Sequence, residues 1–327
     1  MRRAALVLAL LAAAPAVAQT GPSFDCAKAS NMIERTICKD AALARDDRAL
    51  AAAYAGLLDR LSGPARESLE KDQVQWIVAR NRSCQREPDV VPYCLKQRYA
   101  ARLDTLRALG EGKYPFVGSQ LIAKSATLGK IAYSIDIRYP QFDGKTADFA
   151  AINRAFADDA KSSAEESTPK ADAGIDREQQ WNYQQDFGLF RPGPDAVTVA
   201  VSSYGYSGGA HGYGATTCLL VDLGTGKQVK PQGVFVAGDK WVGELARLVA
   251  ADLKKQFVAN PGFEDALEPR KLAELLGDAG RYCWRRGELE LIFNAYDVGP
   301  YSAGAYTVEI PYERLKPVLR RDGPIAH

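Results

Sequence analysis

The stretch IAYSIDIRY, residues 131–139, alternates large apolar side chains with small or polar ones. This period of two predicts a half-buried β-strand that turns one face toward a core. Before residue 110, the apolar side chains recur instead at spacings of three and four, which is typical of amphipathic helices. Residues 131–139 therefore lie just beyond the point where a helical region gives way to a region that contains strands.

On the N-terminal side of this point, residues 23–109 are predicted to form a small helical bundle. Leu50, Leu57 and Leu61 follow helical spacing, and Ser62-Gly63-Pro64 is expected to end one helix and begin the next. A bundle of this size buries a limited core and benefits from covalent links. Four cysteines fall near the predicted helix ends: Cys26, Cys38, Cys84 and Cys94.

On the C-terminal side, residues 115–320 are predicted to form an α+β domain with a mainly antiparallel sheet. The helical and strand-like stretches do not alternate regularly, which argues against a doubly wound parallel sheet. The strand-like stretches are 131–139, 181–189, 197–201, 218–222, 289–296 and 306–310, and the helical stretches are 147–164, 240–257, 271–276 and 312–319.

Residues 1–18 have the pattern of a secretory signal peptide. Arg2 and Arg3 precede an apolar run over residues 4–14, and Ala16-Val17-Ala18 supplies small residues for cleavage near Gln19. The run is shorter than the roughly 20 residues that a membrane-spanning helix needs. We therefore expect a periplasmic or secreted protein with no stable membrane insertion after signal cleavage.

The chain has six cysteines, and an even count in an exported protein favours disulfide bonds. Four cysteines lie before residue 95, and the other two are Cys218 and Cys283. This split predicts one bond between Cys218 and Cys283 and two bonds within the N-terminal region. The pairing among the first four cysteines stays open at this point.

Composition and charge argue against several classes of function. Lys and Arg number 42 and Asp and Glu number 40, so the chain is nearly neutral and has no basic block for nucleic acid. The two histidines, His211 and His327, nearly exclude a site with several histidine ligands. We expect neither a metal nor a cofactor, and no nucleic-acid partner.

One catalytic pattern is present by its letters, because Gly205, Ser207 and Gly209 match the G-x-S-x-G motif of serine hydrolases. That motif needs a helix directly after the serine and a histidine farther along the chain. The residues that follow Ser207 are rich in glycine, which disfavours a helix, and His211 lies only four residues beyond it. We therefore predict that the chain is not an enzyme.

Two loops combine tyrosine with glycine, at residues 204–214 and 296–304. Tyrosine offers a large contact area at low entropic cost, and glycine allows close approach. One interpretation is a recognition surface, and the other is that these tyrosines only cap the core. For the recognition surface, the candidate binding residues are Tyr206, Ser207, His211, Tyr296 and Tyr301.

A series of residues within 23–109 resembles the LprI-type lysozyme-inhibitor domain, an exported helical module with four cysteines. The resemblance implies that this region binds lysozyme. The matching residues are Phe24, Asp25, Cys26, Glu34, Arg35, Thr36, Ile37, Cys38, Leu43, Asp47, Leu50, Tyr54, Gln73, Trp76, Ile77, Arg80, Asn81, Cys84, Cys94, Tyr99, Arg102 and Leu103.

A second series, within residues 115–320, is similar to the extracytoplasmic domain of RsiV-type anti-sigma factors. It also resembles the non-catalytic N-terminal part of PdaC-type peptidoglycan deacetylases. The first of these resemblances implies an α+β domain that binds lysozyme. The matching residues are Gly208, Gly209, Ala210, His211, Leu223, Gly224, Thr225, Gly226, Lys227, Phe293, Asn294, Tyr296, Gly299, Pro300, Tyr301, Gly304, Ile310, Pro311 and Tyr312.

Together these patterns predict a protein that binds a lysozyme-like muramidase and inhibits it by occluding the cleft of the enzyme. Such a cleft carries two catalytic carboxyl groups that an inhibitor can cover. The alternative is a non-catalytic module that binds peptidoglycan itself, since aromatic loops suit sugars as well as proteins. The sequence does not separate these two hypotheses.

Overall fold

The computed structural model describes residues 21–85, 90–110, 116–170, 177–238 and 240–325. The predicted signal peptide, residues 1–18, lies outside the described residues. So does most of the segment between the helical region and the first strand, residues 111–115.

The N-terminal region is helical and carries two disulfide bonds. Its helices are α1 (Met32–Lys39), α2 (Ala41–Leu58), α3 (Gly63–Cys84) and α4 (Val91–Gly110). Asp40 begins α2, because its side chain accepts hydrogen bonds from the backbone N–H groups of Ala42 and Leu43. The bonds Cys26–Cys38 and Cys84–Cys94 settle the pairing that the sequence leaves open.

A six-stranded sheet forms the centre of the molecule, with its strands in sequence order. Neighbouring strands are antiparallel except for β2 and β3, which are parallel and connected through helix α5 (Ala150–Glu166). The strands are β1 (Phe116–Leu128), β2 (Ile131–Asp143), β3 (Gln179–Gly193), β4 (Ala196–Tyr206), β5 (Tyr213–Asp222) and β6 (Lys227–Val229). This mixed, mostly antiparallel sheet after a helical region confirms the predicted fold class.

The chain then forms a C-terminal lobe around a three-stranded antiparallel sheet. The lobe has an aromatic core in which Phe235 stacks on Trp241 with ring centroids 4.5 Å apart. Its elements are α6 (Pro231–Val234), α7 (Lys240–Ala259), α8 (Pro269–Leu276), β7 (Tyr282–Trp284), β8 (Glu288–Phe293), β9 (Tyr306–Pro311) and α9 (Tyr312–Leu315).

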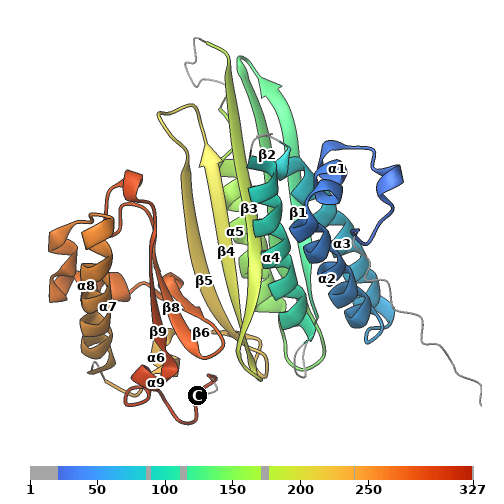
Figure 1. The fold of residues 1–327 in the computed structure, drawn as a ribbon. Helices are drawn as coiled ribbons and strands as arrows, with labels where there is room; N and C mark the ends of the chain where they lie inside the picture. Colours follow the sequence, from blue (N-terminus) through green and yellow to red (C-terminus); the bar gives the residue numbers. More distant parts are fainter. Residues whose placement is uncertain (1–20, 86–89, 111–115, 171–176, 239, 326–327) are drawn as a thin grey trace, which may run out of the picture.

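The central sheet separates two layers of helices. Helix α4 lies in front of the sheet and α5 lies behind it, while the C-terminal lobe lies beside β5 (Figure 1). Residues of the N-terminal helices and of the sheet share one apolar cluster, which includes Trp76, Leu106, Phe116 and Val197. The helices therefore pack directly onto the sheet, and the division into domains at 23–109 and 115–320 stays a proposal.

Several details differ from the sequence-based prediction, and three of them have a local reason. Strand β1 was not predicted, because its second half is exposed and gives no clear alternation. The strand predicted over 289–296 ends at Phe293, because Tyr296 takes a left-handed backbone conformation with φ of 75°. The helix predicted over 312–319 ends at Leu315, because Leu319 turns away to form a β-bridge with Phe235.

Candidate functional site

An aromatic cluster forms where the loop between β4 and β5 meets the loop between β8 and β9. The His211 ring stacks on the Tyr301 ring with centroids 3.7 Å apart and planes 17° apart. The Tyr296 ring lies 5.9 Å from the Tyr301 ring. We call His211, Tyr296 and Tyr301 the aromatic cluster.

Hydrogen bonds orient the imidazole within this cluster. Nδ1 of His211 lies 2.8 Å from the carbonyl oxygen of Gly212, so it carries the proton and donates it. The other nitrogen, Nε2, lies 3.4 Å from the hydroxyl oxygen of Tyr296. Residues 85 positions apart in the sequence therefore hold each other in place.

The backbone around Tyr296 is strained yet well supported. Among the described residues that are not glycine, Tyr296 alone has a positive φ. Side chains rarely adopt this conformation, and such strain persists only where the surroundings impose it. Here the next residue, Asp297, pairs with Arg281, and Asn294 exchanges hydrogen bonds with the backbone of Thr216 on β5. The Tyr296 ring is nonetheless 59% exposed, so the fold presents it to solvent.

The glycines of the β4–β5 hairpin make room for two more tyrosines. A Cβ atom at Gly205 would lie 2.5 Å from the Tyr213 ring, and one at Gly212 would lie 2.2 Å from the Tyr204 hydroxyl. The two rings lie on opposite faces of the hairpin, because Tyr213 pairs with Gly205, the neighbour of Tyr204. Tyr204 is 48% exposed and Tyr213 is 50% exposed.

The structure places three of the five predicted binding residues in contact with one another, namely His211, Tyr296 and Tyr301 of the aromatic cluster. Tyr206 is the last residue of β4 and pairs with Asn182, and Ser207 is exposed in the loop, so neither belongs to the stacked rings. Ser207 lies between two antiparallel strands and no helix follows it, so the strand-to-helix elbow of a serine hydrolase is not formed there. Whether these five residues bind a partner stays a prediction, as does the expectation that the chain is not an enzyme.

Four of the residues that carry the resemblance to LprI-type domains interact inside the bundle. Tyr99 donates a hydrogen bond to Asp47 at 2.7 Å and accepts one from Arg80 at 2.9 Å. The Arg80 guanidinium also lies 5.0 Å from the centre of the Trp76 ring. All four residues are buried. They hold the bundle together, and a partner of this region would have to contact other residues.

Sequence reasoning missed a network of charges where the helices meet the sheet. Asp72 on α3 binds Arg102 on α4 at 2.6 Å and Arg138 on β2 at 2.7 Å. Asp186 on β3 binds Arg138 and Arg98, each at 3.1 Å. We call these five residues the helix–sheet network. Its members come from four elements, with Asp72, Arg98 and Arg102 in the predicted helical module and Arg138 and Asp186 in the predicted α+β module, so no spacing in the sequence reveals it.

The charge state of this network follows from its burial and its pairing. Burial by itself would raise the pKa of the Asp72 carboxyl group, but Arg102 and Arg138 outweigh this effect and hold the pKa below its ordinary value. Burial lowers the pKa of Arg102, yet an arginine keeps its proton at physiological pH. Asp72 is therefore a carboxylate between two guanidinium groups.

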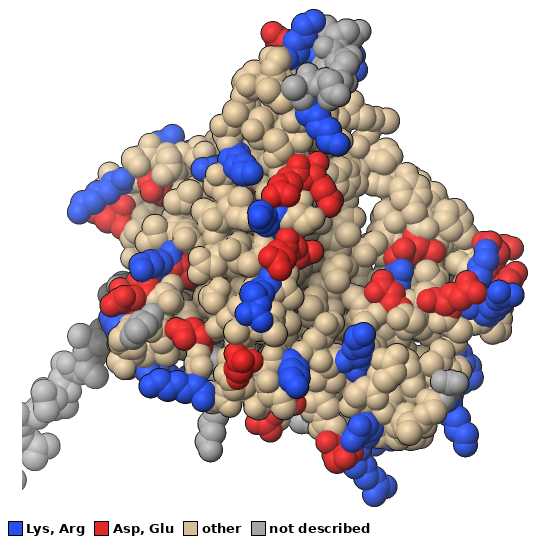
Figure 2. All heavy atoms as spheres, turned by 180° about the vertical axis from the view of Figure 1, so that it is seen from behind, with Lys and Arg blue, Asp and Glu red and all other residues tan. Residues whose placement is uncertain are grey.

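Two further properties concern the described residues as a whole. No group of three or more His, Cys, Asp or Glu side chains in the described part of the chain is arranged to hold a metal ion. None of the described helices combines the length and the apolar composition needed to cross a membrane. Acidic and basic side chains are interspersed on the face that Figure 2 shows, so that face has no large field of one sign.

Comparison with known families divides the chain into three matched segments. Residues 26–106 match the family described as Lysozyme inhibitor LprI, and residues 129–213 match Deacetylase PdaC. Residues 233–313 match a Protein of unknown function, DUF3298. The first two matches confirm the LprI-type and PdaC-type resemblances and their order along the chain.

Solved structures with a similar course of the chain include two proteins of the DUF3298 family. One, from Pseudomonas aeruginosa PAO1, is 17% identical, with a TM-score of 0.45, and covers 64% of this chain and 96% of its own. The other, from Bacteroides fragilis NCTC 9343, is 16% identical, with a TM-score of 0.44 and the same two coverages. No curated protein matches the chain.

Proposed function

We propose that this chain is an exported protein that binds a lysozyme-like muramidase and inhibits it by occluding the catalytic cleft. The match of residues 26–106 to Lysozyme inhibitor LprI supports binding of this kind. Three disulfide bonds support export, because such bonds persist in oxidising compartments. The observation that carries the proposal is the preassembled aromatic cluster.

The aromatic cluster has the properties of a binding anchor. Stacking of His211 on Tyr301 and the support around Tyr296 fix the rings before any partner arrives, so little side-chain entropy remains to be lost. Aromatic residues are enriched among the few side chains that dominate binding energy. Their polar edges suit a cleft whose catalytic groups are carboxyl groups.

Helix α3 offers a second surface on the same molecule. Val74, Ile77 and Val78 lie at helical spacing on its outer side and are 63%, 38% and 48% exposed. Such a stripe is a common feature of protein contacts, although scattered exposed apolar residues also occur without function. The proposal assigns the cleft contact to the aromatic cluster and gives this stripe the role of a flanking contact.

A cell-wall clearing assay with lysozyme and the purified mature protein tests the proposal. We expect inhibition by the wild type and a loss of at least about tenfold in potency for His211→Ala and for Tyr296→Gly. Glycine tolerates the positive φ at position 296, so this variant removes the ring without adding backbone strain. Ile77→Ser is expected to have a smaller effect.

Tyr213→Ala is the matched control, since Tyr213 is an exposed tyrosine on the same hairpin but outside the aromatic cluster. Equal losses for Tyr213→Ala and Tyr296→Gly would contradict the assignment of the contact. Absence of both inhibition and co-elution at micromolar concentration would reject the proposal. Retention on insoluble peptidoglycan without lysozyme would instead favour the peptidoglycan-binding alternative.

A further inference from the structure

A cavity of about 180 Å³ lies where helices α3 and α4 meet the central sheet. We call it the junction cavity. Cavities between separately folded regions are frequent ligand sites. Neither region forms it alone, because Ala79 and Ser83 come from α3, Arg98 comes from α4, and the remaining lining residues come from β1 to β4. Those remaining residues are Leu121, Asp136, Arg138, Gln184, Gln185, Asp186, Ser202, Ser203 and Tyr204.

The charged groups of the junction cavity already neutralise one another. Asp186 binds both Arg98 and Arg138, and Asp136 pairs with Arg82. A strongly charged ligand would have to break these pairs in a partly buried setting, which is unfavourable. A neutral ligand with several hydroxyl groups can instead add hydrogen bonds to the outer lone pairs and N–H groups of intact ion pairs.

Uncharged polar groups and an aromatic ring complete the lining. The Gln184 amide offers both donors and an acceptor, and the Ser202 hydroxyl lies two residues from Tyr204 on the same strand. Tyr204 pairs directly with Gln184 across β3 and β4, and this half-exposed tyrosine lines the same cavity. An apolar ring face beside planar hydrogen-bonding groups matches a sugar, which has an apolar face and an equatorial rim of hydroxyl groups.

One buried donor in the lining is unsatisfied. Arg138 is almost fully buried, and its Nε has no hydrogen-bond partner among the described residues. Buried N–H groups nearly always have an acceptor, so an exception calls for an explanation. Arg138 therefore lines the junction cavity while one of its N–H groups lies buried without an acceptor.

We propose that the junction cavity binds one neutral sugar ring, with Gln184, Ser202 and the Arg98–Asp186 pair holding its hydroxyl groups and Tyr204 facing its apolar side. The volume is below the range of pockets for drug-sized ligands, which is about 300–1,000 Å³, and suits a single ring. The Tyr204 ring reaches Gly212, the residue after His211, so the sugar site borders the aromatic cluster. This inference does not depend on the proposed binding of a muramidase.

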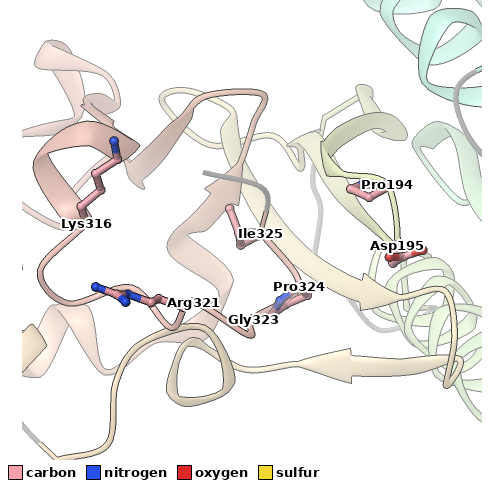
Figure 3. Close-up of a pocket in the computed structure, with 7 residues that line it drawn as sticks. All are labelled: Pro194, Asp195, Lys316, Arg321, Gly323, Pro324 and Ile325. Atoms are coloured by element: carbon pink, nitrogen blue, oxygen red, sulfur yellow. The ribbon is translucent and has the colours of Figure 1, made fainter.

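A larger cavity of about 570 Å³ beside the turn between β3 and β4 is less suited to a ligand. Its basic side chains, Lys316 and Arg321, point in different directions rather than toward a common point (Figure 3). Lys316 is also paired with Glu313 at 2.7 Å. Nothing in this lining converges on one group, which leaves the junction cavity as the better site.

Saturation-transfer NMR on the full mature protein, without lysozyme, tests the sugar site. The probes are N-acetylglucosamine, glucose and galactose, with glycine as a zwitterion and acetate as an anion. We expect transfer to at least one sugar with a dissociation constant on the order of 1 mM, and none to glycine or acetate. Gln184→Ala and Tyr204→Ala are expected to weaken sugar binding by about fivefold or more.

Two matched controls separate the cavity from the rest of the surface. Gln180→Ala removes a glutamine on the same face of β3, outside the cavity, and Tyr213→Ala removes a tyrosine of equal exposure on the other face of the hairpin. Both should bind the sugar like the wild type. Transfer to none of the sugars, transfer to glycine or acetate, or equal weakening by the controls would each overturn the proposal. The clearing assay reports separately on muramidase binding, so the two proposals can fail independently.

Discussion

The central sheet is joined to its two neighbours in two different ways. The N-terminal helices are joined to it by buried charges, since the side chain of Asp72 is only 3% exposed between Arg102 and Arg138. The C-terminal lobe is joined to it by the Cys218–Cys283 bond between β5 and β7 and by the hydrogen bond from Thr198 to the backbone of Trp284.

One junction stabilises the molecule through its effect on the unfolded chain, and the other through contacts in the folded protein. A disulfide acts largely by restricting the unfolded chain, so it needs little from its surroundings. A buried ion pair recovers the cost of leaving water only when every partner is in place, and it fixes orientation more than it adds stability. The proposed sugar site lies where the helices meet the sheet, and the aromatic cluster forms where the β4–β5 hairpin meets the C-terminal lobe. Both candidate surfaces thus form where parts of the chain meet.

Replacing Asp72 should have the largest effect of the changes considered. Asp72→Ala removes the carboxylate partner of the buried Arg102 guanidinium and leaves Arg138 paired with Asp186 alone, so we expect a loss of about 3–5 kcal/mol in the free energy of unfolding. Urea unfolding followed by circular dichroism measures this loss. Asp104→Ala is the control, because Asp104 pairs with Arg107 on the surface and should contribute less than about 1 kcal/mol. Similar losses for the two variants would show that burial does not increase the contribution of the helix–sheet network to stability.

Removing the disulfide between the sheet and the C-terminal lobe should have the next largest effect. The bond joins residues 65 positions apart, and Cys218→Ser/Cys283→Ser should lower the free energy of unfolding by about 2–4 kcal/mol. The loss should be smaller for Cys26→Ser/Cys38→Ser, because that bond closes a separation of 12 residues. Comparison of the two urea midpoints checks this order, and the reverse order would argue against the chain-entropy explanation.

Lowering the pH should weaken the junction between the helices and the sheet more than the junction that contains the disulfide. We expect this effect to be smaller than the two above. The pKa of Asp72 is lower in the folded protein than in the unfolded chain, so the unfolded chain binds more protons as the pH falls. The stability that this carboxylate contributes is present above about pH 4 and is lost as the pH falls through the folded pKa. Urea midpoints measured from pH 6 to pH 2 should fall less steeply for Asp72→Asn than for the wild type. For the Cys218→Ser/Cys283→Ser variant, the urea midpoint should fall with pH as steeply as for the wild type. A flatter dependence on pH in this variant would contradict the assignment of the acid effect to Asp72.

The sequence predicted those strands and turns whose conformation is determined within a short stretch of residues. The alternation over 131–139 lies within β2, and the turn that connects β5 to β6 also has local causes. There Gly226 supplies a φ of 69°, and the Asp222 side chain accepts from the backbone of Gly224 and Thr225. Strand β1 escaped prediction because its order comes from pairing with β2 rather than from its own periodicity.

The candidate site was predictable only in part. Tyrosine and glycine in two loops indicated His211, Tyr296 and Tyr301, but their stacking depends on the contact between β5 and the loop after β8. Val74, Ile77 and Val78 are apolar residues of a predicted helical region, yet they are exposed because the other side of α3 packs on the bundle and the sheet. The junction cavity gave no sequence signal, because its lining comes from six separate elements.

The sequence by itself determined the helical and strand-bearing regions, the Cys218–Cys283 bond and the two tyrosine-rich loops, because periodicity, cysteine count and composition are local or additive properties. Only the tertiary structure decided that Asp72 is paired with arginines from both regions and that His211 stacks on Tyr301. Those outcomes depend on which faces of the helices and sheet meet. The faces that meet are determined by the burial of apolar and charged surface across the whole chain, so no short stretch of residues predicts them.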